Sequence, residues 1–131
     1  MPRSVSKVVV FATIILAIAT GPAAAQDSTF DAQSIIGEWQ GSWVDPRDPS
    51  NTGSYFMTIK KVDSGRVFTR LYIVGRGAFE GDREATLTGN TMVMQTQYNR
   101  AEFVFQGRQM RGTTRNLSSG IVIQEITLLK K

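Results

Sequence analysis

The chain has 131 residues, contains no cysteine and no histidine, and carries a formal net charge of +4. Its length is enough for one domain and no more. The missing histidine and cysteine exclude imidazole- and thiol-based catalytic triads, zinc held by those residues, and haem held by histidine. Only carboxylate pairs remain for acid–base chemistry, so we expect a protein that is not an enzyme and uses no metal and no cofactor.

Residues 1–25 are predicted to be a cleavable signal peptide. A positive start, Arg3 and Lys7, is followed by an apolar run over residues 8–19. Three alanines at positions 23–25 then supply the small-x-small pattern that precedes a signal peptidase cleavage site. An uncleaved membrane anchor is the alternative, but a spanning helix needs about 20 apolar residues and this run is shorter. We therefore predict a periplasmic or secreted protein without a stable membrane span after cleavage.

Cleavage would remove Arg3 and Lys7 and lower the formal charge from +4 to +2. A nucleic-acid-binding domain normally carries a larger and more clustered positive excess. We therefore predict no nucleic-acid partner. Because the chain has no cysteine, an apolar core and a hydrogen-bonded sheet must stabilise the domain without disulfides.

The mature chain is predicted to begin with an N-terminal arm, residues 26–34, followed by the folded domain, residues 35–131. The arm is polar, with Phe30 as its one large apolar side chain, and residues 29–33 are compatible with a single helical turn. Beyond the arm, short runs of alternating apolar and polar side chains are separated by Gly, Asn and Asp. This pattern is typical of β-strands joined by tight turns.

The alternation predicts eight strands. Strand one places Trp39 and Trp43 on one face, and the prolines at positions 46 and 49 predict a loop over residues 45–53, because proline lacks the amide donor of a sheet interior. The predicted strands are residues 35–44, 55–62, 66–74, 83–88, 91–97, 101–106, 109–114 and 121–128.

Short connections between so many strands predict an all-β fold, a single small antiparallel up-and-down barrel. An open sheet would leave two long edges prone to aggregation, and closure removes those edges. A barrel of eight strands has an interior that side chains fill or that holds one small ligand. A β-sandwich is the alternative, and the hairpin-length connections favour the barrel.

The first strand resembles the opening strand of calycin-type barrels, which include lipocalins, avidins and lipocalin-like inhibitors of secreted bacterial metalloproteases. The likeness rests on a Gly-x-Trp pattern, Gly37 and Trp39, after a possible helical turn. It implies a structural plug in which Gly37 bends the strand and the Trp39 indole covers one end of the barrel. The chain lacks the cysteines of many of these families and has no avidin-like ligand set, so the resemblance implies a fold more than a function.

The leading functional hypothesis is an exported binding protein with a small apolar or amphiphilic ligand in the barrel lumen. Trp43 would lie near the mouth, and methionine side chains would adapt to ligands of varied shape. Core packing is the alternative role for each of these residues. The predicted ligand-binding residues are Trp43, Tyr55, Met57, Met92, Met94 and Phe103.

Seven arginines between positions 70 and 115 are spaced so that some could gather at one rim of the barrel. Such a patch would attract a carboxylate, a phosphate head group or an acidic partner. The second functional hypothesis is a protein-binding module, such as an inhibitor of a secreted hydrolase or an envelope-assembly partner. It would use the arm from Gln26 and the loop of residues 45–53. Asp45 and Asp48 in that loop are compatible with a carboxylate pair or a calcium site, but a solvated turn fits their context better.

Overall fold

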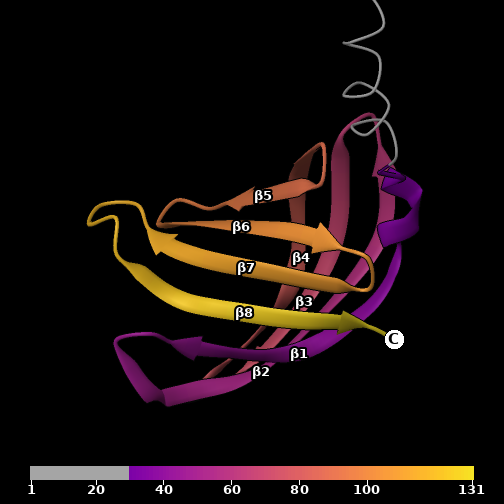
Figure 1. Cartoon of the computed structure of the whole chain (residues 1–131). Helices are drawn as coiled ribbons and strands as arrows, with labels where there is room; N and C mark the ends of the chain where they lie inside the picture. The colour runs from indigo at the N-terminus through magenta and orange to yellow at the C-terminus, as the bar shows by residue number, and fades with distance from the viewer. Residues whose placement is uncertain (1–29) are drawn as a thin grey trace, which may run out of the picture. The chain divides into compact units, whose positions relative to one another are not determined.

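Eight antiparallel strands close into one barrel in the order β1 to β8, and β8 pairs back onto β1 (Figure 1). The computed structural model describes residues 30–131; the predicted signal peptide and residues 26–29 of the predicted arm lie outside the described residues. The predicted all-β barrel is confirmed, and the sandwich alternative is wrong.

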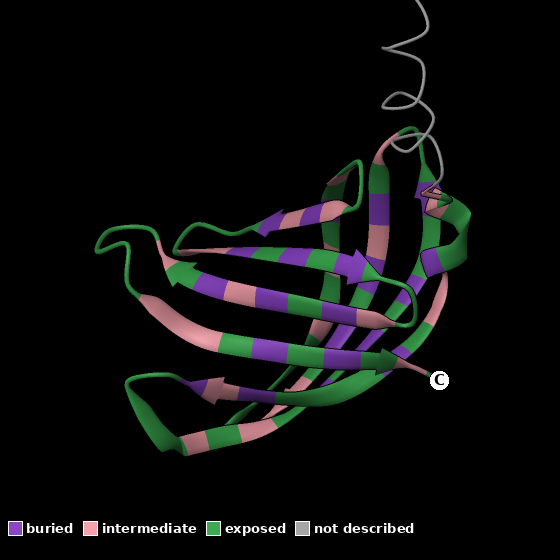
Figure 2. Ribbon diagram, viewed as in Figure 1, coloured by how far each residue is buried: buried purple, intermediate pink, exposed green. Residues whose placement is uncertain are grey.

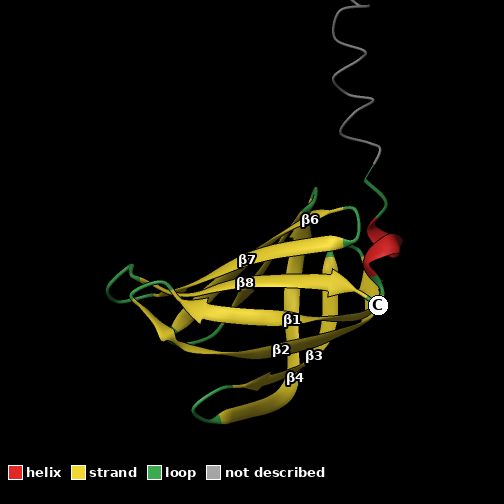
Figure 3. Ribbon diagram, turned by 60° about the horizontal axis from the view of Figure 1, so that its bottom comes forward, coloured by secondary structure: helices red, strands yellow, loops and turns green. Residues whose placement is uncertain are grey.

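The strands follow one another along the chain with short turns between them, and a 3-10 helix, η2 (Ala32–Ile35), precedes the first strand (Figure 3). Within residues 30–131, no helix is both long and apolar enough to cross a membrane. The strands are β1 (Gly37–Asp45), β2 (Asp48–Asp63), β3 (Arg66–Val74), β4 (Ala78–Thr88), β5 (Thr91–Gln95), β6 (Asn99–Gln106), β7 (Gln109–Asn116) and β8 (Val122–Lys130).

The predicted loop at residues 45–53 is wrong, because β1 and β2 form a long hairpin there. β2 begins at Asp48, and its pairing with β1 shifts register between Val44 and Asp45, so residues 49–51 bulge from the ladder. β3 pairs with β2 only from Ser54 onward. Pro49 is tolerated because a bulge on an unpaired edge does not need its amide donor.

Strand β4 begins at Ala78, five residues before the predicted start at position 83. Gly81 and Asp82 look like a turn in the sequence, but they lie within a strand that pairs with β3 along its length from Ala78 to Thr86. The longer strand adds an inward-facing row of side chains to the barrel wall, and this row forms part of the candidate site.

Buried and exposed residues alternate along most strands, so one face of each strand lines the barrel interior (Figure 2). The buried Trp39 links η2 to this interior: its Nε1 donates to Ile35 O at 2.9 Å, and its ring meets Phe105 edge-on with centroids 5.5 Å apart. Gly37, between η2 and this strand position, has a φ of 139°, a conformation that residues with a Cβ rarely adopt.

Candidate functional site

The wall of the barrel has its shortest run of paired residues between β4 and β5. These strands share only three residue pairs, at Thr86, Leu87 and Thr88 of β4. The preceding part of β4, residues 78–85, pairs with β3 alone within residues 30–131. Because β5 is short and pairs with only the last residues of β4, the barrel interior is open to solvent at this seam.

A cavity of about 450 Å³ occupies this opening. Its volume falls within the range of about 300–1,000 Å³ that is usual for small-molecule sites. The lining combines apolar side chains of β2, β3, β5 and β6 with polar side chains at the loop end. The lining residues are Tyr55, Leu71, Ile73, Phe79, Arg83, Met94, Thr96, Gln97, Tyr98, Asn99, Ala101, Thr114 and Gln124.

Arg83 supplies the positive charge of the cavity. It lies opposite the buried Thr69 of β3 and two residues from the buried Ala85, so the strand alternation turns its side chain inward. Its Nη1 donates to Asp82 O at 2.9 Å, but its guanidinium makes no ion pair among the side chains that the structure describes. The outward-facing carboxylates beside it on β4 instead bind cations of β2 and β3.

Tyr55 lies against the same cavity and is 2% exposed. Its ring meets Phe103 edge-on, with centroids 6.2 Å apart. In the described part of the chain, its hydroxyl has no hydrogen-bond partner. Burial raises the pKa of the Tyr55 phenol well above its ordinary value, and the nearby charge of Arg83 opposes part of that shift. The phenol is therefore a neutral donor throughout the physiological pH range.

Neutral polar side chains complete the opening. Thr114 Oγ1 lies 3.1 Å from Gln124 Oε1, which links β7 and β8 at the cavity lining. The β5–β6 loop adds Gln97, and the first residue of β6 adds Asn99. The cavity therefore offers one cation, one buried phenol and several amides and hydroxyls around an apolar interior.

The six residues that the sequence analysis proposed for ligand binding are all buried, but they occupy different places. Tyr55 and Met94 line the cavity, whereas the other four are not among its lining residues. Met92 and Phe103 face each other across β5 and β6, and together with Met57 they fill the interior. Trp43 packs against Gly75 and donates from Nε1 to Val74 O at 3.1 Å.

Phe79 was not predicted as a site residue because the predicted fourth strand began only at residue 83 and left Phe79 in a loop. Arg83 was among the seven arginines of the predicted patch, but its inward direction was not predicted. A signal for the correct strand was present: acidic residues at positions 80, 82 and 84 alternate with the inward row of Phe79, Gly81 and Arg83. The remaining missed residues come from the loop end, where no periodic pattern marks which side chains face inward.

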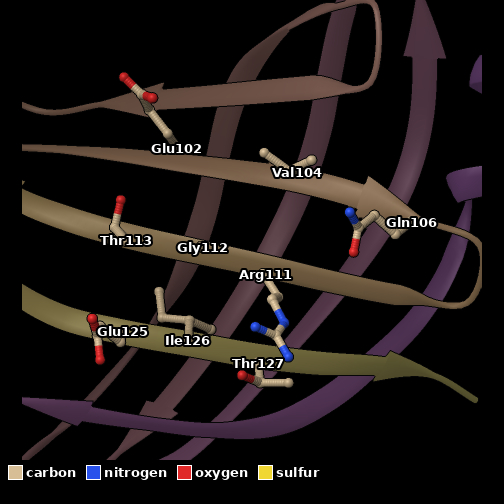
Figure 4. Close-up of a pocket in the computed structure, with 9 residues that line it drawn as sticks. All are labelled: Glu102, Val104, Gln106, Arg111, Gly112, Thr113, Glu125, Ile126 and Thr127. Carbon is tan, nitrogen blue, oxygen red and sulfur yellow. The ribbon is translucent and has the colours of Figure 1, made fainter.

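A second hollow, of about 530 Å³, lies on the outer face of β6, β7 and β8 (Figure 4). Most of its lining side chains, such as Arg111 and Glu125, are exposed strand residues on the solvent side of the barrel, although Gly112 and Ile126 beside them are buried. This hollow contains neither a buried polar group nor an enclosed apolar surface. It is therefore a weaker candidate for ligand binding than the cavity at the seam.

The aspartates of the β1–β2 hairpin serve structural contacts. Arg47 donates to both carboxylate oxygens of the buried Asp45, at 3.0 and 2.8 Å, and this hydrogen bonding holds the pKa of that carboxyl well below its usual range. Asp48 accepts from Ser50 and pairs with Arg76 at 3.3 Å. Within residues 30–131, no cluster of three or more acidic side chains could hold a metal ion.

No known protein family, no curated protein and no solved structure matches this chain.

Proposed function

We propose that this protein is an exported, non-catalytic, calycin-like barrel that binds a small amphiphile with an anionic head group in the cavity between β4 and the β5–β6 loop. The observation that carries the proposal is that one cavity holds both a cation without an ion pair and a buried hydroxyl without a hydrogen bond. Arg83 lacks a carboxylate partner, and the buried Tyr55 hydroxyl lacks a hydrogen-bond partner, within the described residues.

Leaving a buried hydroxyl unsatisfied costs about 1–3 kcal/mol, so such groups in a native structure call for an explanation. An anionic oxygen would accept from the Tyr55 phenol, while the Arg83 guanidinium offers a planar fork that suits a carboxylate, sulfonate or phosphate. The raised pKa of Tyr55 favours this role, because a neutral phenol donates to the anion and does not repel it.

The rest of the cavity selects against a purely polar anion. Leu71, Ile73 and Met94 offer apolar surface next to the polar groups, and burying a hydrocarbon tail there gains about 25 cal/mol per Å² of apolar area. The methionine thioether adapts to tails of different shape. A ligand with an acidic head and an apolar body therefore satisfies both parts of the site.

A matched pair of fluorescent probes tests the proposal. 1-Anilinonaphthalene-8-sulfonate is anionic, and N-phenyl-1-naphthylamine is the same aromatic body without the charge. We expect the sulfonate to bind near one equivalent and more tightly than the neutral probe, and decanoate to displace it. Because such probes also bind loosely packed states, near-UV circular dichroism must show fixed tertiary structure under the same conditions. Absence of saturable sulfonate binding would overturn the proposal.

The second candidate function, a protein-binding module, is favoured by the β1–β2 hairpin. Asp48, Thr52 and Gly53 of β2 pair with β1, residues 49–51 bulge from that ladder, and pairing with β3 begins only at Ser54, so the tip of the hairpin extends past β3. The Asp45–Arg47 contacts stiffen this tip and lower the entropic cost of recognition. If neither probe binds, the hairpin becomes the leading candidate for a functional surface.

A further inference from the structure

Two loops at the open end of the barrel present large apolar side chains to solvent. Tyr98 of the β5–β6 loop is 67% exposed, and Leu117 and Ile121 of the β7–β8 loop are 44% and 45% exposed. The loops are in direct contact, because Leu117 N donates to Tyr98 O at 2.8 Å. We call these three side chains the loop rim. Both loops lie at the same end of the barrel in Figure 1.

Two arginines flank the loops that carry the loop rim. Across residues 95–101 and 114–124, which include both loops, the charged residues are Arg100 and Arg115. Arg100 is balanced by Glu102 at 2.9 Å, whereas Arg115 donates to a backbone carbonyl, Gly120 O, at 3.1 Å. The loop rim is therefore an apolar surface with an uncompensated arginine beside it and no acidic side chain within either loop.

We infer that the loop rim docks onto an anionic lipid surface. Leucine and isoleucine would enter the head-group boundary, tyrosine would sit at the level where its ring and hydroxyl are both accommodated, and Arg115 would contact lipid phosphates. Tyr98 also lines the cavity at the β4–β5 seam, so the docked face is continuous with the cavity opening. Leu117, Ile121 and Arg115 do not line the cavity, so docking stands without the proposed ligand.

Sedimentation with lipid vesicles tests this inference on the purified protein. Vesicles of phosphatidylcholine mixed with an equal part of phosphatidylglycerol should bind the protein, about fivefold more tightly than phosphatidylcholine alone, as expected for one arginine near an anionic surface. Arg115→Gln should remove most of this preference. Leu117→Ser and Ile121→Ser should each weaken binding about tenfold through lost apolar burial.

Leu129 provides a matched control. It is 57% exposed, but it lies on β8 beside Gln109, at the β6–β7 end of the barrel. Leu129→Ser should leave vesicle binding unchanged. If Leu129→Ser weakens binding as much as Leu117→Ser, general surface hydrophobicity explains the effect and the inference fails. It fails equally if the wild-type protein does not sediment with either vesicle, or if ultracentrifugation shows that the rim instead joins two copies in a dimer that Leu117→Ser dissociates.

The outcomes separate this inference from the proposed function. Arg83→Met should keep vesicle binding while it weakens binding of the sulfonate probe. A protein that binds the probe but not vesicles would contradict the docking inference alone, and one that binds vesicles but not the probe would contradict the ligand proposal alone.

Discussion

The guanidinium of Arg83 lies over the ring of Phe79, with Cζ 4.4 Å from the ring centroid. Both side chains project from the same face of β4, four residues apart, and both line the cavity. A cation stacked on an aromatic ring gains about 0.5–1 kcal/mol at an exposed site. The contact therefore holds Arg83 in place before a ligand arrives and reduces the entropy that binding must remove.

Replacing the ring of Phe79 tests this positioning role. Phe79→Leu keeps an apolar side chain but removes the stacking surface, so we expect affinity for the sulfonate probe to fall about two- to fivefold. The free energy of unfolding should change little, because Phe79 lies at the surface. Titration calorimetry and urea denaturation measure the two effects. If the affinity of Phe79→Leu equals that of the wild type, Phe79 does not position the arginine.

Tyr55→Phe should separate stability from binding. It removes a buried hydroxyl that lacks a partner in the described part of the chain, so the apo protein should be as stable as the wild type or more stable, by up to about 1–3 kcal/mol. The same change should weaken binding of the anionic probe, because one donor is lost. Urea denaturation that shows clear destabilisation would mean that the hydroxyl has a structural partner.

Trp39 should be the most sensitive core position on β1. Trp39→Ala removes the contact with Phe105 and the hydrogen bond to Ile35 O, and a cavity of this kind costs about 3–5 kcal/mol. Trp39→Phe should cost less, because it retains part of the ring. The intrinsic fluorescence of Trp43 reports unfolding in both variants. A Trp39→Ala protein with an unchanged urea midpoint would show that this indole is not part of the stabilising core.

Acid should destabilise the protein through carboxylates that are ion-paired in the folded state. The Arg47 side-chain hydrogen bonds lower the pKa of Asp45, and those from Lys60 lower the pKa of Asp82. A carboxyl group whose pKa is lower in the folded than in the unfolded protein stabilises the fold at pH values above its unfolded-state pKa of about 4. This stabilisation is lost as the pH falls through the folded-state pKa. Urea midpoints should therefore decrease below pH 4.

Asp45→Asn should flatten this pH dependence, because the amide does not titrate. Glu125→Gln is the charge-matched control, since the Glu125 carboxylate makes no ion pair among the described residues. Equal slopes for Asp45→Asn and the wild type would show that Asp45 is not a main source of acid sensitivity.

Periodic features of this chain were predictable from sequence, and features fixed by pairing were not. The inward side of β1 follows from the spacing of Trp39 and Trp43, and the barrel follows from the number of short strands. The start of β4 could not be predicted from the sequence. Gly81 and Asp82 favour a turn in isolation, whereas pairing with Leu71 and Arg70 holds them in a strand.

The same limit applies to the candidate site. Inward alternation correctly gave Tyr55 and Met94 a buried position, but the distinction between cavity wall and filled interior depends on where β5 ends. The position of the end of β5 explains why Met94 lines the cavity at the seam, while Met92 packs against Phe103 in the filled interior. Strand length at this point is set by pairing with β4 and β6, which one sequence does not reveal.

The most direct test of the central claim is the change that Arg83→Met makes in the affinities of the two matched probes. Methionine keeps much of the apolar stem and removes the charge, so 1-anilinonaphthalene-8-sulfonate should bind at least about tenfold more weakly, since hydrogen bonds to charged groups contribute about 1.5–3 kcal/mol. N-phenyl-1-naphthylamine should bind with unchanged affinity, and the urea midpoint should stay the same. An equal loss of affinity for both probes, or no loss for the sulfonate, would contradict an anion-binding role for Arg83.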